Sequence, residues 1–357
     1  MRFANRHSRP ERDFVFLTGE GDFAHGDYLR GKVVLFVSRG DRIKGVQLRM
    51  TGRVRFRDHI TSSCGSAQWE NGDELLHQWD PFLIQNQPSP TDRTYEWPFE
   101  LYIHGNQRET VRGCSQCSIS YILEAKILTE CGSETFGDST PIRITRLPPL
   151  SAYELMDSFT AQGKWSVGVK YSVSVSHQAI ALGGVIPVQI WLRQLDQGVE
   201  FTKARLYLQE THTLRANLPP NSITCIARRT VVEWPVALSN GQQFQTWEQH
   251  LQLPKVVRKC SPDFDICGVA ISHTLHFAAT LRDGSRTQLE FETSIPIFLF
   301  VSPDLPINGW GVFVQDTGTV GAEASNVLAK GICTPPTYDQ AVNYGNPGGI
   351  FPPPYVE

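Results

Sequence analysis

The chain contains 357 residues, roughly two to three times the length of a usual domain, which predicts two domains and a remainder. Apolar residues make up 40% and charged residues 19%, a balance typical of globular proteins that excludes a wholly disordered chain. The net charge of −3 disfavours a general nucleic-acid binder, because such proteins depend on basic residues that neutralise phosphates.

The hydropathy of the chain predicts no membrane-spanning helix. Its most apolar stretch, Ser294 to Val301, reaches about eight residues, whereas a spanning helix needs about twenty. Residues 1–13 contain no apolar segment of signal-peptide length. The eight cysteines are spread along the chain, as in proteins that keep free thiols in a reducing compartment. We therefore expect a cytoplasmic protein.

Apolar and polar residues alternate with a period of two in four segments, which is the pattern of half-buried strands. In chain order these segments are residues 46–57, 119–127, 165–175 and 271–281. Turn-rich sequences, such as residues 38–41 and 282–285, separate the apolar runs. Helical periodicity is rare, and only residues 151–162 and 323–330 could form short helices. The pattern predicts an all-β fold of antiparallel sandwiches, each with one solvated face.

A weak internal repeat indicates that two similar sandwiches follow each other. Apolar residues stand at offsets of two, four and six after Gly31, and again after Gly184. Chance alternation in a strand-rich chain is the alternative explanation. The boundary is expected near residues 147–150, where two prolines would stop strand pairing. We expect consecutive domains over residues 12–146 and 163–303, a linker over 147–162, and a flexible tail over 304–357.

The tail differs from the rest of the chain in charge and composition. Residues 304–357 carry one basic residue against five acidic ones. Six prolines and four glycines fall within the last 27 residues. Because this composition makes a packed core implausible, we expect a disordered segment with polyproline-like pieces.

Two Pro-Pro-x-Tyr motifs lie in this tail, at residues 335–338 and 352–355. Consecutive prolines favour a left-handed helix with about three residues per turn, which places each tyrosine on the same face as the first proline. WW domains bind such ligands in an aromatic groove. The thirteen residues between the motifs span roughly 20 Å, so tandem WW domains could bind both with an avidity gain of roughly 10². The alternative is an incidental proline-rich tail.

Four arginines share one face of the first predicted strand: Arg49, Arg53, Arg55 and Arg57. Guanidinium groups form forked hydrogen bonds with phosphates and carboxylates. This face could therefore bind cargo through a phosphorylated tail, or an acidic lipid head group. The alternative is a solvated strand face whose arginines pair with acidic residues of neighbouring strands.

Cysteine spacing gives only weak evidence for a metal site. Cys114 and Cys117 have the spacing of half a zinc site, which Cys131 and Cys64 could complete. A second Cys-x-x-Cys or a histidine pair at ligand spacing does not occur in the sequence. We therefore predict no metal and no other cofactor.

Motifs of catalysis do not occur in the sequence. It contains no Gly-x-Ser-x-Gly elbow, no phosphate-binding Gly-x-x-x-x-Gly-Lys-Ser/Thr loop and no His-Glu-x-x-His. His273 and His276 would face opposite sides of the last predicted strand, as one core and one surface residue. We predict a protein that is not an enzyme, and the alternative is a site assembled from scattered loops.

Seven segments of the chain match the pattern of a known family. They are residues 14–19, 29–35, 43–52, 95–101, 120–125, 165–173 and 206–210. With these segments the chain resembles the arrestins, in particular the alpha-arrestins of fungi, over about residues 12–303. The aromatic-Pro-Phe sequence at residues 97–99 and the Tyr-x-Leu-x-Ala sequence at residues 121–125 are similar to strands of the arrestin N-domain. Residues 165–173 and 206–210 are similar to the start of the C-domain.

The resemblance implies an adaptor. Two arrestin domains would recognise a membrane cargo, such as a plasma-membrane transporter or receptor, while the tail binds the WW domains of a HECT-type ubiquitin ligase. The docking residues would be Pro335, Pro336, Tyr338, Pro352, Pro353 and Tyr355. The expected outcome is ubiquitin-dependent endocytosis, with recruitment from the cytoplasm to the plasma membrane or endosomes. The alternative is an arrestin-fold scaffold for vesicle sorting that acts without a ligase.

The chain departs from the family pattern at a turn of the second domain. Residues 195–198 read Leu-Asp-Gln-Gly, where family members often have Leu-x-Lys-Gly, so a ubiquitin-acceptor lysine is not expected there. Lys330, five residues before the first docking motif, is the candidate acceptor instead. Lys170 and Lys203 are weaker candidates because they lie on predicted strands. Compared with the family pattern, residues 80–90 look like an insertion before the strand that contains the aromatic-Pro-Phe sequence.

Overall fold

The computed structural model describes residues 8–10, 12–19, 24–56, 72–84, 92–112, 117–148, 154–194, 200–218, 221–237, 244–255, 257, 259–266, 269–282, 288–303 and 306–313. Within these residues the chain forms nineteen strands and no α-helix. The all-β class predicted from period-two alternation is therefore confirmed. No helix that could cross a membrane is found in this described part of the chain.

The first nine strands form one sandwich. They are β1 (Ser8–Pro10), β2 (Phe14–Leu17), β3 (Asp27–Val37), β4 (Ile43–Phe56), β5 (Gly72–Gln78), β6 (Phe82–Leu83), β7 (Arg93–Ile103), β8 (Cys117–Thr129) and β9 (Glu134–Arg146). One sheet has the order β1-β3-β7, and the other has the order β2-β9-β8-β4-β5, with β6 paired to β4. Val33 and Leu35 of the smaller sheet share a buried core with Leu48 and Leu123 of the larger one.

The remaining ten strands form a second sandwich. They are β10 (Phe159–Lys164), β11 (Val169–Val175), β12 (Ala179–Ala181), β13 (Val185–Gln194), β14 (Glu200–Leu218), β15 (Asn221–Pro235), β16 (Phe244–Gln252), β17 (Phe264–Ile266), β18 (Val269–Arg282) and β19 (Gln288–Phe300). One sheet has the order β10-β11-β13-β16, and the other has the order β12-β19-β18-β14-β15, with β17 paired to β18. Val173 and Ile190 share a buried core with Leu206 and Phe277 across the two sheets.

Both sandwiches have the same strand order. The larger sheet β2-β9-β8-β4-β5 of the first corresponds to β12-β19-β18-β14-β15 of the second, and β1-β3-β7 corresponds to β11-β13-β16. In each sandwich a short edge strand runs parallel to the last strand, β2 beside β9 and β12 beside β19. The internal repeat predicted two similar sandwiches, and this shared topology confirms the prediction.

The four predicted strands overlap β4, β8, β11 and β18. β4 ends at Phe56, and β11 begins only at Val169 because residues 165–168 form a turn. Burial alternates along β18 as the sequence predicted. Its buried positions include Ile271, His273, Leu275 and Phe277. A strand with this alternation presents one side to the core and the other to solvent or a neighbouring layer.

The described part of the range 151–162, residues 154–162, does not form the predicted helix. Residues 154–156 make a single 3₁₀ turn, and residues 159–162 belong to β10, which pairs with the edge of β11. A helix this short is marginal on its own, so the hydrogen bonds offered by an unpaired strand edge decide the local structure. β10 also shortens the linker expected over residues 147–162. The second predicted helix, residues 323–330, lies outside the described residues.

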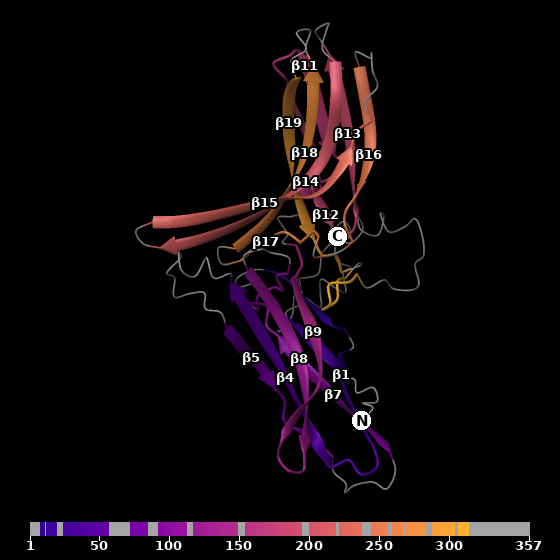
Figure 1. Cartoon of the computed structure of the whole chain (residues 1–357), viewed down its shortest axis with the longest axis vertical. Coiled ribbons are helices and arrows are strands. Elements are labelled where there is room, and N and C mark those ends of the chain that lie inside the picture. Colours follow the sequence, from indigo (N-terminus) through magenta and orange to yellow (C-terminus); the bar gives the residue numbers. More distant parts are fainter. Residues whose placement is uncertain are drawn as a thin grey trace, which may run out of the picture.

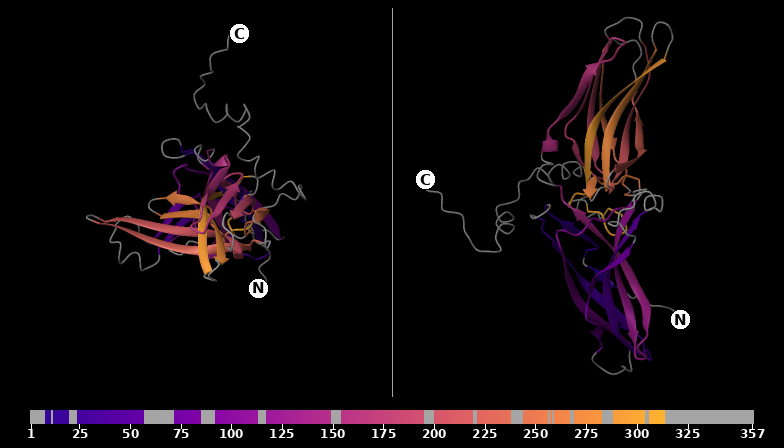
Figure 2. Two further views of the ribbon diagram at one scale, coloured as in Figure 1. Left: turned by 90° about the horizontal axis from the view of Figure 1, so that it is seen from above. Right: turned by 90° about the vertical axis from the view of Figure 1, so that its left-hand side faces the viewer.

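The two sandwiches lie end to end along the longest axis of the molecule (Figures 1 and 2). The β14–β15 pair extends sideways from their junction as a long hairpin (Figure 1). Phe264 and Val269 of the second sandwich pack against the core of the first. Ser261 Oγ donates a hydrogen bond to the carbonyl of Arg112 at 3.3 Å. The junction is therefore a packed interface between the sandwiches.

Residues 306–313, which we call the strap, join both sandwiches after β19. Ile307 is buried in the core of the second sandwich, whereas the carbonyl of Asn308 accepts a hydrogen bond from Arg143 Nε of the first at 3.1 Å. Gly309 lies so close to Pro141 that a Cβ atom would stand 1.6 Å from the Pro141 carbonyl oxygen. Only glycine permits this approach.

Candidate functional site

The two docking motifs, residues 335–338 and 352–355, lie outside the described residues, as does Lys330. The roles predicted for them therefore stay predictions. Lys170 and Lys203 are exposed on β11 and β14, so both are accessible on the second sandwich.

The structure pairs the described arginines of β4 with carboxylates of neighbouring strands. Arg49 lies 3.1 Å from Glu134 of β9. Arg53 forms a forked pair with both carboxylate oxygens of Asp73 on β5, at 3.0 and 3.1 Å, and Arg55 lies 2.8 Å from the same carboxylate. Arg57 lies outside the described residues.

The ion pairs of β4 agree with the alternative interpretation of a solvated, paired strand face. Hydrogen bonds from Arg53, followed by those from Arg55, lower the pKa of the Asp73 carboxyl below its ordinary value. Asp73 therefore remains a charged competitor for any acidic ligand of Arg53 and Arg55. Binding of a phosphate or lipid head group to this face stays a prediction.

The cysteine half site cannot be placed in full. Cys64 and Cys114 lie outside the described residues, and of Cys117 only the backbone is described. Cys131 is an exposed free thiol on the turn between β8 and β9. His273, by contrast, is buried and lies on the core side of β18, as its strand position predicted.

A cluster of polar side chains, which we call the Glu210 cluster, lies in the second sandwich near the junction. Its members are Glu210, His212, Arg229, Cys260, Asp263 and His273. Glu210 and His212 continue the buried face of β14 after Leu206 and Leu208. In the register of the antiparallel pair, Glu210 stands directly opposite His273 of β18. Two polar residues therefore meet at positions where the alternation calls for apolar ones.

Every oxygen of the Glu210 carboxylate has a partner. Oε1 accepts a hydrogen bond from Arg229 Nε at 2.7 Å and contacts the ring of His212. Oε2 accepts a hydrogen bond from the backbone N–H of Ser261 at 3.0 Å and lies 3.3 Å from His273 Nε2. A buried carboxylate is tolerated only with such partners, because an isolated charge in the interior costs several kcal/mol.

Asp263 holds the other side of the His273 ring. Its Oδ1 lies 2.5 Å from His273 Nδ1 and also accepts the backbone N–H of Leu299 at 3.1 Å. Burial alone would lower the pKa of His273, but its contacts with Asp263, Cys260 and Glu210 raise that pKa well above the ordinary value. Burial raises the pKa of Asp263. The ring is thus fixed from both nitrogens.

Burial and hydrogen bonding also have opposite effects on the pKa of Glu210. Burial would raise the pKa of its carboxyl, but hydrogen bonds from His212, His273 and Arg229 outweigh burial and hold the pKa well below the ordinary value. Glu210 is therefore a carboxylate at neutral pH. It is the fixed negative charge around which the other members of the cluster gather.

A cavity of about 700 Å³ opens beside the Glu210 cluster, between the two sandwiches. Asp263 and Phe264 line it from the second sandwich, and Glu109 and Arg146 line it from the first. Arg146 donates hydrogen bonds to the carbonyls of Gly19 and Gly105, at 2.7 and 2.8 Å, which fix its guanidinium in the wall. The cavity has charged groups of both signs and lies next to the cluster.

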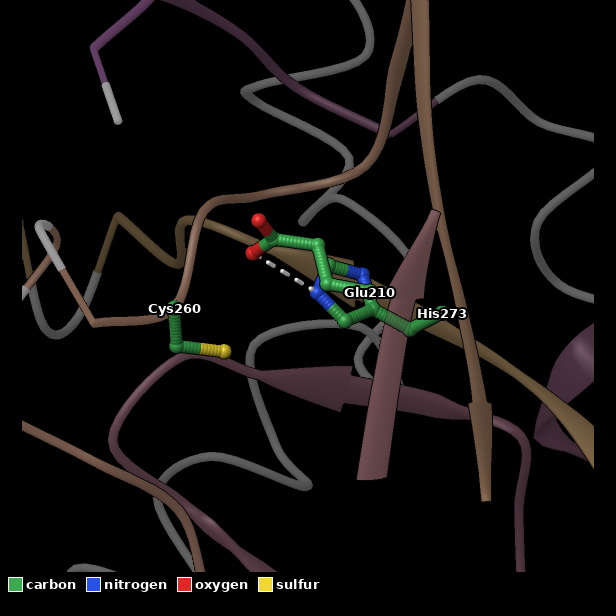
Figure 3. A group of neighbouring side chains, drawn as sticks. All are labelled: Glu210, Cys260 and His273. Carbon is green, nitrogen blue, oxygen red and sulfur yellow. Dashed lines mark hydrogen bonds and ion pairs between the residues drawn. The ribbon is translucent and has the colours of Figure 1, made fainter. Parts of the chain in front are cut away.

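Sequence reasoning missed the Glu210 cluster. One feature of the sequence could have indicated it. Glu210 is a charged residue that follows Leu206 and Leu208 at the spacing of two residues expected for the buried side of a strand. Three of its members, Glu210, Cys260 and His273, offer a carboxylate, a thiol and an imidazole whose ligand atoms lie within 4.8 Å of one another (Figure 3). These are ligand types of transition metals.

Comparisons with known proteins agree with this architecture. Residues 165–304 match the family model described as "Arrestin (or S-antigen), C-terminal domain". The chain is 27% identical to "Probable HECT-type ubiquitin ligase-interacting protein creD" of Aspergillus oryzae, over 97% of this chain and 61% of the relative. It is 27% identical to "HECT-type ubiquitin ligase-interacting protein creD" of Emericella nidulans, over 97% and 61%, and 28% identical to a relative of Neosartorya fischeri with the same coverage.

The chain spans about three fifths of the length of these curated relatives. The alignments nevertheless extend over both sandwiches, and the arrestin match falls on the second of them. Two sandwiches of one topology, the match of residues 165–304 to the arrestin C-terminal domain, and relatives aligned along 97% of the chain support an arrestin-like protein.

Proposed function

We propose that this arrestin-like chain is a non-enzymatic adaptor that brings a WW-domain ubiquitin ligase of the HECT type to membrane cargo. The observation that carries the proposal is the pair of Pro-Pro-x-Tyr motifs at residues 335–338 and 352–355. The relatives from Aspergillus oryzae and Emericella nidulans are named as proteins that interact with a HECT-type ubiquitin ligase, which supports the proposal.

Docking of the ligase requires no catalytic group from this chain. Consecutive prolines such as Pro335 and Pro336 favour a polyproline helix, in which Tyr338 would lie on the same face as Pro335 one turn later. The second motif repeats this surface within tethering distance, so that one ligase with tandem WW domains can bind both motifs at once. A segment that already favours the polyproline conformation would lose little conformational entropy on binding.

The two sandwiches form the cargo-binding body of the proposed adaptor. In this arrangement the cargo is a plasma-membrane transporter or receptor, and the ligase bound to the tail modifies lysines of the cargo for endocytosis. The adaptor works in the cytoplasm and is recruited to the plasma membrane or endosomes. Lys330, five residues before the first motif, is the proposed ubiquitin acceptor on the adaptor itself.

The proposal is tested by binding of the purified chain to a tandem WW fragment of a HECT ligase, measured by titration calorimetry. Tyr338→Ala or Tyr355→Ala alone removes one of two tethered sites and should weaken binding by roughly 10². The double variant should lose binding altogether.

The matched control is Tyr344→Ala, which removes a tail tyrosine outside both motifs and should bind as the parent chain does. Undiminished binding by the double variant, or no binding by the parent chain, would reject ligase recruitment. Either result would favour a sorting scaffold that acts without a ligase.

A further inference from the structure

Three different metal-ligand types converge in the interior of the second sandwich. The carboxylate of Glu210, the thiol of Cys260 and the imidazole of His273 lie within 4.8 Å of one another, and all three residues are buried (Figure 3). Cys260 is a free cysteine with an exposed fraction of 1%. This grouping differs from the cysteine half site considered from sequence, since it uses neither Cys114 nor Cys117.

The fold holds these three groups on separate segments. Glu210 and His273 are cross-strand partners in the β14–β18 pair, so their side chains project to the same side of one sheet. Cys260 precedes β17, and the backbone N–H of the next residue, Ser261, donates to Glu210 Oε2 at 3.0 Å. The thiol is therefore held beside the carboxylate by the backbone of its own segment.

The surroundings of His273 resemble the outer shell of a metal site. A metal-bound histidine usually donates its other ring N–H to a carboxylate, which fixes the tautomer and makes the binding nitrogen more basic. Asp263 Oδ1 lies 2.5 Å from His273 Nδ1, and the backbone N–H of Leu299 orients that carboxylate in turn. Nδ1 is therefore the protonated nitrogen, and Nε2 points toward Glu210 and Cys260.

The oxygen that faces His273 is available to a cation. Arg229 and His212 occupy Oε1 of Glu210, whereas Oε2 has Ser261 as its backbone donor and His273 as its other neighbour. A carboxylate oxygen has two lone pairs, so Oε2 can accept the Ser261 N–H and bind a metal with the second. Arg229 then neutralises the remaining charge of the carboxylate.

We propose that Glu210, Cys260 and His273 bind a zinc ion inside the second sandwich. Thiolate, imidazole and carboxylate together suit Zn²⁺, whereas Mg²⁺ and Ca²⁺ prefer sites made of oxygens. Three protein ligands leave one position of a tetrahedral ion for a water molecule. The ion ties the β14–β18 pair to the segment before β17.

Metal ligands bind in their deprotonated forms, so zinc binding would release protons to solvent. The carboxylate of Glu210 and the thiolate of Cys260 would then offset the double positive charge of the ion. The usual cost of placing an uncompensated charge in a protein interior is therefore avoided.

The position of the site links it to the junction. Ser261, which follows Cys260, donates from Oγ to the carbonyl of Arg112 in the first sandwich. Phe264 of β17 packs against the core of that sandwich. A zinc ion that fixes this segment would therefore stabilise the contact between the two sandwiches as well as the second sandwich itself.

The test uses the full chain, stripped of metal with a chelator and then titrated with Zn²⁺ or Co²⁺ alone. The parent chain should bind one ion per chain, and the cobalt form should show the near-ultraviolet charge-transfer band of a thiolate ligand. Zinc should also raise the thermal unfolding midpoint, because it binds the folded state. A folded parent chain without equimolar binding, or without the thiolate band, overturns the proposal.

Four variants assign the ligands. Cys260→Ser should lose the thiolate band and the zinc-dependent rise in the unfolding midpoint, and His273→Gln should lose that rise. Asp263→Asn, which removes only the outer carboxylate, should weaken zinc binding by about 10- to 100-fold while keeping the band at saturation. Cys131→Ser, which removes the exposed free thiol, is the matched control and should behave as the parent chain.

A fifth variant separates this site from the cysteine half site seen in the sequence. The double substitution Cys114→Ser with Cys117→Ser should keep both the stoichiometry and the thiolate band. Loss of the band in this double variant, together with its retention in Cys260→Ser, would place the metal elsewhere and overturn the proposal. Because the parent chain is decisive by itself, the test stands even if Cys260→Ser fails to fold.

Discussion

Arg143 of β9 donates a hydrogen bond from Nε to the backbone carbonyl of Asn308 at 3.1 Å, although 165 residues separate them in the chain. The Arg143 side chain is almost wholly buried, and burial lowers its pKa to about 10. A buried guanidinium requires fixed acceptors, so the strap forms part of its environment. Through this bond, residues far apart in the chain hold the two sandwiches together.

Gly309→Ala should loosen the strap. The new methyl group would stand 1.6 Å from the Pro141 carbonyl oxygen, so the strap must move away and Arg143 loses its acceptor. We expect the free energy of unfolding to fall by about 1–3 kcal/mol. Hydrogen exchange should become faster at the amide of Gly311, which donates to the Asn308 carbonyl at 2.9 Å.

Gly40→Ala is the control for the Gly309 variant. Gly40 has a positive φ of 88° and no atom within 4 Å of an added Cβ, so alanine costs only the backbone strain of about 1 kcal/mol. Exchange in the strap should not change in this variant. Unchanged exchange at Gly311 in Gly309→Ala would show that the strap does not depend on the close approach.

Tyr121→Phe should destabilise the first sandwich by about 1–2 kcal/mol. The buried hydroxyl donates to the carbonyl of Arg108 at 2.7 Å and accepts a hydrogen bond from Gln107 Nε2 at 3.0 Å. Chemical unfolding would measure the loss. Tyr28→Phe, at an exposed position, is the control and should change the free energy of unfolding by less than about 0.5 kcal/mol.

The Tyr121 variant should also change the alkaline pH dependence. Burial raises the pKa of Tyr121 to about 12, above its value of about 10 in the unfolded chain. The folded state therefore favours the neutral phenol, and this contribution to stability is complete below pH 10 and lost as the pH rises toward 12. Tyr121→Phe should show a shallower loss of stability over that range. An identical slope in both proteins would contradict the assignment.

Asp73→Asn should release Arg53 and Arg55 from their common carboxylate. If the arginine face of β4 binds acidic lipid, this variant should sediment with phosphatidylserine vesicles more strongly than the parent chain, and high salt should abolish the gain. The stability change should stay within about 1 kcal/mol, because both ion pairs are largely exposed.

Glu233→Gln is a matched control for the Asp73 variant, since it frees Arg205 of β14 in the second sandwich from an ion pair of 3.0 Å. It should leave vesicle binding unchanged. Equal binding by Asp73→Asn and the parent chain would leave the face of β4 as a solvated, ion-paired surface.

Lys330→Arg should reduce ubiquitin conjugation of the chain in a reaction reconstituted with a WW-domain HECT ligase. The substitution keeps the positive charge but removes the amine that accepts ubiquitin. Lys170→Arg and Lys203→Arg are the controls on exposed strand positions, and they should be conjugated as the parent chain is. Full conjugation of the Lys330 variant would exclude this lysine as the main acceptor.

Most of the fold could be predicted from the alternation of apolar and polar residues along its strands. Period-two alternation identified parts of β4, β8, β11 and β18 because the core selects apolar side chains on one side of each strand. Apolar offsets after Gly31 and Gly184 predicted the duplicated topology. The prediction of a helix over residues 151–162 was wrong. Residues 159–162 belong to β10 and pair with the edge of β11, and the hydrogen bonds of that pairing outweigh the local helical pattern.

The Glu210 cluster could not be assembled from sequence spacing. Its potential metal ligands, Glu210, Cys260 and His273, come from three separate segments, and only the register of β14 against β18 brings the first and last together. Motif spacing works where one loop or helix supplies several ligands, as in the Cys-x-x-Cys considered at residues 114–117. Long-range strand pairing leaves no such local trace.

The repeated topology also sets an order of assembly during synthesis. Each sandwich is closed by a parallel pair between an early short strand and its last strand, Phe14 opposite Arg143 in the first and Ala179 opposite Phe298 in the second. Neither sheet is complete until its final strand has left the ribosome, and such distant pairing is slow. The first sandwich can close before the second has emerged. The strap follows β19 in the chain, so its hydrogen bond with Arg143 can form only after the strands of both sandwiches have been synthesised.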